Sequence, residues 1–160
     1  MKKTLFIMVV IVLGLTLSSC KRSDNDDPDW DGPAGLYILL EGSANPAVLF
    51  VNGLPNPSTI RVRVTNAEGT PLANQTILLR QLDYNYNVVS WGEFEGGVAS
   101  ITRTTNANGE ISVIFFSPLS MSADADIMYI HALLQVNGHA YPYSGVPQDF
   151  ISIALMLSGY

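Results

Sequence analysis

The sequence predicts an all-β domain built as a two-sheet β-sandwich. Short segments rich in β-branched and aromatic residues recur along the chain, and turn-forming residues separate them about every 8–12 residues. No helical periodicity follows residue 20. Strands of this kind bury one face each between two packed sheets, so we expect a single core.

The first strand is expected at the edge of a sheet. Two short apolar segments, 35–41 and 47–51, are separated by Gly-Ser-Ala-Asn-Pro. The Asn52-Gly53 pair and two prolines follow them. Edge positions tolerate such interruptions because their missing donors leave no partner unpaired. The next segment, 58–65, alternates between apolar and polar side chains and predicts a strand with one buried face.

The remaining strands follow in the same rhythm. Asn108-Gly109 predicts the tight turn of a β-hairpin, because both residue types tolerate a positive φ. Segment 127–136 is apolar on both faces and predicts a central strand. Strands are expected at 75–82, 88–94, 98–105, 111–116, 127–136 and 150–157, which together make residues 34–160 one domain.

The N-terminal segment has the features of an export signal. Two lysines precede an apolar run over 5–17, which is shorter than the roughly 20 residues that span a bilayer. The run ends in Leu-Ser-Ser-Cys20, which resembles a lipobox. The resemblance implies that residues 1–19 are a lipoprotein signal peptide and that acyl chains on Cys20 anchor the mature protein. An ordinary signal peptide cut nearby is the alternative.

Residues 20–33 form an acidic segment that predicts a flexible tether after the lipidated cysteine. In bacterial lipoproteins an aspartate after the lipidated cysteine commonly retains the protein at the inner membrane, so Lys21 at this position points, by resemblance, to the outer membrane. Segment 23–31 resembles the acidic export tag of surface lipoproteins. Residues 27–32 also match the opening of a calcium loop, but Ile38 occupies the position where that loop needs a glutamate. We therefore expect a solvated spacer.

Composition excludes several classes of function. The 160-residue chain has a net charge of −6, and beyond residue 33 its basic residues are four scattered arginines, so we expect no nucleic-acid partner. A single cysteine rules out an intramolecular disulfide. His131 and His139 lack metal-ligand spacing, Asp124 and Asp126 make only a weak pair, and no nucleophile elbow is present. We expect no cofactor, no metal and no catalysis.

Aromatic residues in two segments are the candidate binding residues. Tyrosine and tryptophan on loops can stack on sugar rings or anchor a protein interface. The alternative is that Trp91 lies in the core and the tyrosines cover its rim. The candidates are Tyr84, Tyr86 and Trp91, with Tyr141 and Tyr143 in a second loop.

Two segments resemble bacterial immunoglobulin-like domains of the invasin and intimin type. Segment 58–74 resembles the second strand of that family and its Asn-x-x-Gly-x-Pro-Leu turn. Segment 104–116 resembles the Thr-Thr-Asp-x-x-Gly-x-Ala-x-Val-x-Phe signature, with Asn106 in the aspartate position and Ile111 in the alanine position. The resemblance implies an immunoglobulin-like β-sandwich of about seven to nine antiparallel strands that has no catalytic residues.

These observations together predict a lipid-anchored envelope protein with one non-catalytic domain. It would serve in surface binding or adhesion, or as a structural spacer. Two alternatives stay open: a periplasm-facing accessory subunit of an envelope complex, and a carbohydrate-binding module that uses the loop aromatics. The expected location is the outer membrane, with the domain facing either the cell surface or the periplasm.

Overall fold

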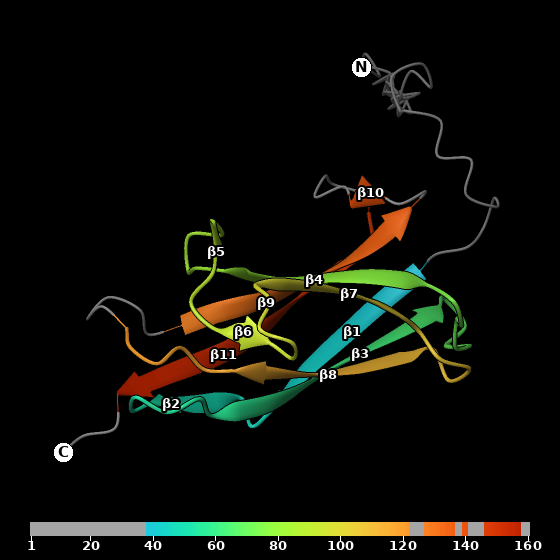
Figure 1. Cartoon of the computed structure of the whole chain (residues 1–160). Helices are drawn as coiled ribbons and strands as arrows, with labels where there is room; N and C mark the ends of the chain where they lie inside the picture. The colour runs from blue at the N-terminus through green and yellow to red at the C-terminus, as the bar shows by residue number, and fades with distance from the viewer. Residues whose placement is uncertain (1–37, 122–126, 137–138, 141–145, 158–160) are drawn as a thin grey trace, which may run out of the picture. The chain divides into compact units, whose positions relative to one another are not determined.

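The computed structural model describes residues 38–121, 127–136, 139–140 and 146–157, and every regular element in these ranges is a β-strand (Figure 1). The prediction of an all-β domain is confirmed. The strands are β1 (Ile38–Asn45), β2 (Val48–Val51), β3 (Pro57–Asn66), β4 (Thr76–Leu82), β5 (Val88–Val89), β6 (Glu93–Phe94), β7 (Ser100–Thr104), β8 (Glu110–Phe116), β9 (Ile127–Val136), β10 (His139–Ala140) and β11 (Gln148–Leu157).

The strands form two packed sheets. The smaller has the order β1-β3-β8-β6, and the larger has the order β2-β11-β9-β4-β5, with β7 also paired to β4 and β10 to β9. When β1, β3, β4, β6, β8, β9 and β11 are lettered A to G, the sheets read A-B-E-D and G-F-C. This is the strand order of an immunoglobulin-like sandwich. The prediction of that fold is confirmed.

The first strand changes sheets part-way along its length. β1 pairs with β3 at the edge of the smaller sheet, and after the Asn45-Pro46 bond β2 pairs with β11 at the edge of the larger sheet. The β2–β11 pair is parallel, whereas the other strand pairs are antiparallel. The prediction of an edge strand interrupted by proline is therefore confirmed.

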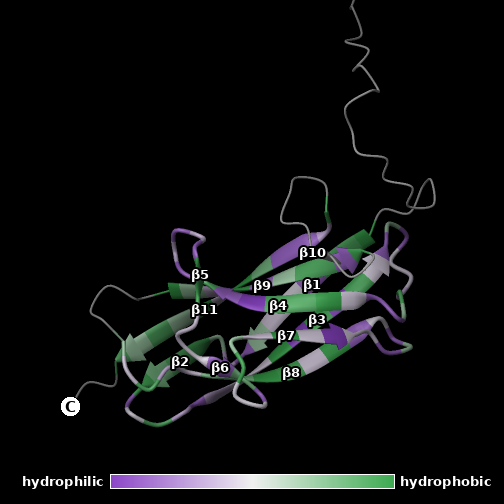
Figure 2. Ribbon diagram, turned by 45° about the horizontal axis from the view of Figure 1, so that its top comes forward, coloured by the Kyte–Doolittle hydropathy of each residue, from purple (hydrophilic) through white to green (hydrophobic). Residues whose placement is uncertain are grey.

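The core lies between the sheets and follows the alternation in the strands. In β3, Ile60, Val62 and Val64 are at most 1% exposed. Phe94 and Phe115 are fully buried and meet edge to face, with ring centroids 5.3 Å apart. Figure 2 shows hydrophobic residues concentrated along the strands and hydrophilic residues in many of the loops.

The predicted hairpin at Asn108-Gly109 is wrong. β7 pairs with β4 in the larger sheet, whereas β8 pairs with β3 and β6 in the smaller sheet, so the connection crosses between the layers. The turn itself is present, with Gly109 at a φ of 72°. An Asn-Gly pair determines the local backbone but not which strand the next segment will join, because that depends on contacts distant in sequence.

The predicted strand over 88–94 is also wrong, because β5 and β6 belong to different sheets. Gly92 between them lies so close to Phe115 and the Phe116 carbonyl that a Cβ atom would overlap both. The fully buried amide of Gln81 holds this crossing. It accepts a hydrogen bond from Gly92 N at 2.8 Å and donates to the carbonyls of Gly92 and Ala99 at 2.8 and 3.0 Å.

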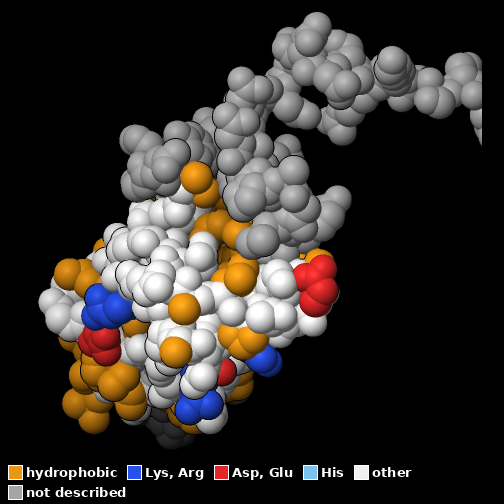
Figure 3. Space-filling model, turned by 90° about the vertical axis from the view of Figure 1, so that its right-hand side faces the viewer, with side chains coloured by type: hydrophobic (Ala, Val, Ile, Leu, Met, Phe, Trp, Pro, Cys, Tyr) orange, Lys and Arg blue, Asp and Glu red, His pale blue; other side chains and the backbone are white. Residues whose placement is uncertain are grey.

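The two segments that resemble the bacterial family pack against each other at one end of the sandwich. Val64 N donates to Gly109 O at 2.8 Å. The buried Thr105 hydroxyl donates to Leu72 O at 2.7 Å and accepts from Gln75 N at 2.9 Å. Figure 3 views this end, where positive and negative side chains are scattered over the visible surface. Both motifs therefore contribute to the architecture of this end.

Candidate apolar binding face

The outer faces of the two sheets differ in chemistry. In the smaller sheet, outward positions of β1, β3, β6 and β8 carry five charged side chains: Glu41, Arg61, Arg63, Glu93 and Glu110. In the larger sheet, Arg80 is the one charged side chain at an outward position of β2, β4, β9 and β11 as the structure describes them. We call this second surface the apolar face. Its residues are Val48, Phe50, Arg80, Ile127, Tyr129, His131, Phe150, Ser152, Ala154 and Met156, together with Tyr86 from the loop after β4.

Strand register makes the apolar face continuous across β2, β11 and β9. Phe50 pairs with Met156, and the row Val48, Ala154 and Ile127 crosses all three strands. Side chains directly opposite each other on one face lie about 5 Å apart, so these residues are neighbours. Phe50 and Met156 are 49% and 50% exposed. Large apolar side chains thus meet solvent side by side.

Four rings form an aromatic cluster on this face. Tyr86 stacks on Tyr129 with centroids 5.4 Å apart and planes at 11°, and it meets the edge of Phe150 at 5.4 Å. Phe150 stacks on His131 at 4.4 Å and 7°. Because each ring contacts another, the cluster presents a fixed apolar surface rather than independent side chains.

His131 is the buried member of the cluster, and its ring is neutral. Arg80 Nε lies 3.3 Å from His131 Nδ1, and because a guanidinium can only donate, Nδ1 is the acceptor. Nε2 therefore carries the proton and donates to Gln148 Oε1 at 2.8 Å. Burial lowers the pKa of His131, the bond to Gln148 opposes this effect, and the charge of Arg80 adds to it. Both ring nitrogens are satisfied, as expected for a structural histidine.

Tyr86 reaches the apolar face from a loop whose geometry occurs three times. In loops 66–70, 83–87 and 106–110, the side-chain oxygen of the first residue accepts hydrogen bonds from the backbone N–H groups of the third and fifth residues. The first N–H also donates to the fifth carbonyl, and the fourth N–H to the first carbonyl. In the middle loop a side-chain hydrogen bond from Asn87 lowers the pKa of Asp83. An Asn or Asp side chain thus builds each loop.

The fourth position of each loop has a positive φ, and only in the middle loop does a large residue hold it. Gly69 and Gly109 have φ values of 79° and 72°, whereas Tyr86 has 64°. A bulky residue in this region is unusual and costs about 1–2 kcal/mol relative to an ordinary backbone conformation. This backbone conformation places the Tyr86 ring against Tyr129 and Phe150 and leaves the residue 59% exposed.

The structure places the other predicted binding residues differently. Tyr84 is 57% exposed in the same loop as Tyr86, and Trp91 is half-buried and packs against the edge of the core. Cys20, Tyr141, Tyr143, the acidic segment and the Asp124–Asp126 pair lie outside the described residues. Sequence reasoning missed Phe150 and Tyr129 as surface residues. Their alternation with buried residues in β11 and β9 was the available signal.

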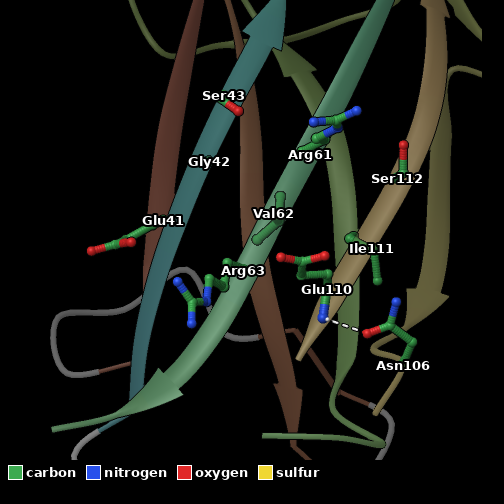
Figure 4. Close-up of a pocket in the computed structure, with 10 residues that line it drawn as sticks. All are labelled: Glu41, Gly42, Ser43, Arg61, Val62, Arg63, Asn106, Glu110, Ile111 and Ser112. Carbon is green, nitrogen blue, oxygen red and sulfur yellow. Dashed lines mark hydrogen bonds between the residues drawn. The ribbon is translucent and has the colours of Figure 1, made fainter. Parts of the chain in front are cut away.

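A shallow hollow on the outer face of the smaller sheet is the other candidate surface (Figure 4). Arg63 lies in register between Glu41 and Glu110, and Arg61 lies between Ser43 and Ser112. Opposite charges alternate across the strands, and the acidic side chains point outward. This arrangement fits a solvated outer face.

The described residues offer no obvious site for a metal or a membrane span. Within these ranges, no three His, Cys, Asp or Glu side chains come together in a way that could hold a metal ion. The same part of the chain contains no helix long and apolar enough to cross a membrane.

Comparisons with known proteins give distant similarities in structure. The scan against family models and the search of curated proteins found no match. Among solved structures, a CARDB domain from Pyrococcus furiosus, crystallised with di-metal ions, is 13% identical; the TM-score is 0.44, covering 77% of this chain and 96% of that one. MtrC from Shewanella baltica is 9% identical with a TM-score of 0.36, and the match covers 77% of this chain but 24% of MtrC.

Proposed function

We propose that this protein is a lipid-anchored, non-catalytic envelope protein whose immunoglobulin-like domain binds a protein through the apolar face. The observation that carries the proposal is the contrast between the two outer faces. A continuous apolar patch, as distinct from single exposed apolar residues such as Leu39 and Ile114 on the other outer face, marks an interaction surface. Aromatic residues and methionine, which this face displays, are enriched in protein interfaces, and charged residues are depleted from interface centres.

A protein surface fits the apolar face better than a sugar does. The exposed apolar residues extend from Val48 and Phe50 on β2, across β11, to Tyr86 beyond β9. A ring-sized ligand would cover only the aromatic cluster and leave the β2 and β11 residues in solvent. The strained Tyr86 supports recognition at this place, because a costly backbone conformation is retained where it displays a ring.

The anchor and the location rest on the N-terminal sequence. The lipobox-like ending at Cys20 supports lipidation, and Lys21 with the acidic segment supports export to the outer membrane. The resemblance to invasin-type and intimin-type domains supports a surface role. Replacing Cys20 by Ala is expected to move the protein from the membrane fraction to the soluble fraction; persistence in the membrane would overturn lipid anchoring.

Binding is tested with a photo-cross-linking amino acid placed at one exposed position on each outer face. Phe150 and Ile114 are 40% and 41% exposed, on the larger and smaller sheets respectively. In cells, we expect protein adducts from position 150 and few from 114. Adducts only from 114, or a polysaccharide smear from 150, would contradict the proposal. Protease treatment of intact cells then shows whether the domain faces outward.

A further inference from the structure

We propose that the partner of the apolar face is a second copy of this chain, joined face to face about a two-fold axis. This inference rests on the proposed function, because it names the occupant of the same surface. An isologous pair needs one surface that is complementary to itself. The apolar face meets this requirement in its chemistry, its area and the direction of its strands.

The charge distribution favours a like surface. The chain carries a net charge of −6, so a partner chosen by charge complementarity would be basic and would need an acidic patch to meet. Arg80 is the one charged side chain at an outward strand position of the described apolar face. A surface that pairs with the apolar face must itself be apolar and nearly free of charge. The apolar face of a second copy is a surface of that kind.

The area is sufficient for a weak pair. With a rise of about 3.3 Å per residue and a spacing of about 4.8 Å, strands β2, β4, β9 and β11 cover about 500 Å². Pairing two copies over the whole of this surface, which extends beyond the apolar face along β4 and the end of β9, would bury about 1,000 Å², the lower limit for a specific interface. Confinement to a membrane raises the local concentration, and a weak interface then becomes occupied.

The strand directions are compatible with two anchors in one membrane. A two-fold axis parallel to β9 and β11 keeps the same ends of both domains together, including the two copies of Ile38 where β1 begins. The segment between Cys20 and Ile38 spans at most about 60 Å when fully extended. Both lipids therefore enter the same bilayer without strain on either domain.

The test uses single cysteines in the full lipidated chain. Acylation occupies Cys20 in the proposed function, so Ser152→Cys places a free thiol on the apolar face, and Ser112→Cys places one on the other outer face. Both serines are exposed. After treatment of membranes with a short flexible bismaleimide, we expect a covalent dimer from Ser152→Cys and at least fivefold less from Ser112→Cys. Equal yields, or no dimer, would overturn self-pairing.

A second pair of variants tests the apolar contacts themselves. Phe50→Arg on β2 and Leu39→Arg on β1 alter residues that are 49% and 47% exposed, on opposite faces. Combined with Ser152→Cys, Phe50→Arg is expected to lower the dimer yield about tenfold, and Leu39→Arg to leave it unchanged. An unchanged yield in Phe50→Arg would contradict the inference, and thermal melts confirm that both variants are folded.

The two proposals fail in different ways. Adducts from position 150 to another protein, with no dimer from Ser152→Cys, would leave the binding face standing and overturn self-pairing. No adduct and no dimer would overturn both. A dimer from Ser152→Cys together with a self-adduct from position 150 would support both.

Discussion

Gly109 and Gly69 have the same backbone conformation but different surroundings. A Cβ atom at Gly109 would lie 2.5 Å from Val64 O and 2.9 Å from Leu72 N, whereas one at Gly69 would have no neighbour within 4 Å. We expect Gly69→Ala to cost about 1 kcal/mol of unfolding free energy, from the positive φ alone. Gly109→Ala should cost about 3 kcal/mol or more, because the loops must also separate. Urea denaturation measures both losses, and equal losses would contradict the close packing of Gly109 against Val64 and Leu72.

We expect His131 to make the free energy of unfolding depend on pH. Folding lowers its pKa through burial, so the unfolded chain binds the proton more readily. The contribution of the neutral ring to the free energy of unfolding is therefore present above about pH 6.5, the pKa of the unfolded state. It is lost as the pH falls below that value toward the lower pKa of the folded state. Arg80 is the charged group that faces the ring.

The measurement is the melting temperature of the wild type and of His131→Gln at pH 7.5 and 5.5. We expect a larger fall on acidification in the wild type, since glutamine does not titrate in this range. Carboxyl groups elsewhere titrate in both proteins and cancel in the difference. Equal falls would show that His131 protonates freely in the folded protein.

At the scale of elements, Gln81 fixes where the chain crosses between sheets. Its amide satisfies the N–H and C=O of Gly92 and the C=O of Ala99, all within the excursion between β4 and β7. Gln81→Leu preserves volume but leaves these groups without partners, each at about 1–3 kcal/mol. We expect a total loss of about 3 kcal/mol or more. Thr102→Val, at an exposed position of β7, is the control and should change stability little.

β3 tests the strand register at the centre of the smaller sheet. Val62 is 1% exposed, whereas its neighbour Arg61 points to solvent. Val62→Asp buries a charge that has no partner and should abolish cooperative folding. Arg61→Ala should change the melting temperature by no more than a degree or so. A Val62→Asp protein with a wild-type melt, followed by circular dichroism, would contradict the register.

The strands that could be predicted were those in which apolar and polar side chains alternate, or those that form a long apolar segment. β3, β8 and β9 have clear patterns, so their positions agree with expectation to within about two residues. The hairpin and the strand over 88–94 failed because pairing partners depend on contacts distant in sequence, such as that between Gln81 and Gly92. Local residue preferences carry no information about those contacts.

At the scale of the whole molecule, the candidate site was only partly visible in the sequence. Tyr86 stood out as an aromatic residue on a polar loop, but Phe150 and Tyr129 looked like ordinary strand residues. Their importance arises from the pairing of β9 with β11 and from the return of the 83–87 loop over that pair. Alternation along β9 and β11 could have indicated that these residues point outward, but it could not show that they form one face, because that depends on how the strands pair in the sheet.

The change of sheet by the first strand has a mechanical consequence. If the anchored domain is pulled away from its membrane along the direction of β1, tension enters the domain at Ile38 and runs lengthwise along that strand. The hydrogen bonds of all eight β1–β3 residue pairs are then loaded together in shear, and they do not break one after another from one end. If β1 yields, β2 is still clamped lengthwise to β11 by its own four pairs. Two shear clamps in series would let this small domain sustain pulling forces at an envelope surface.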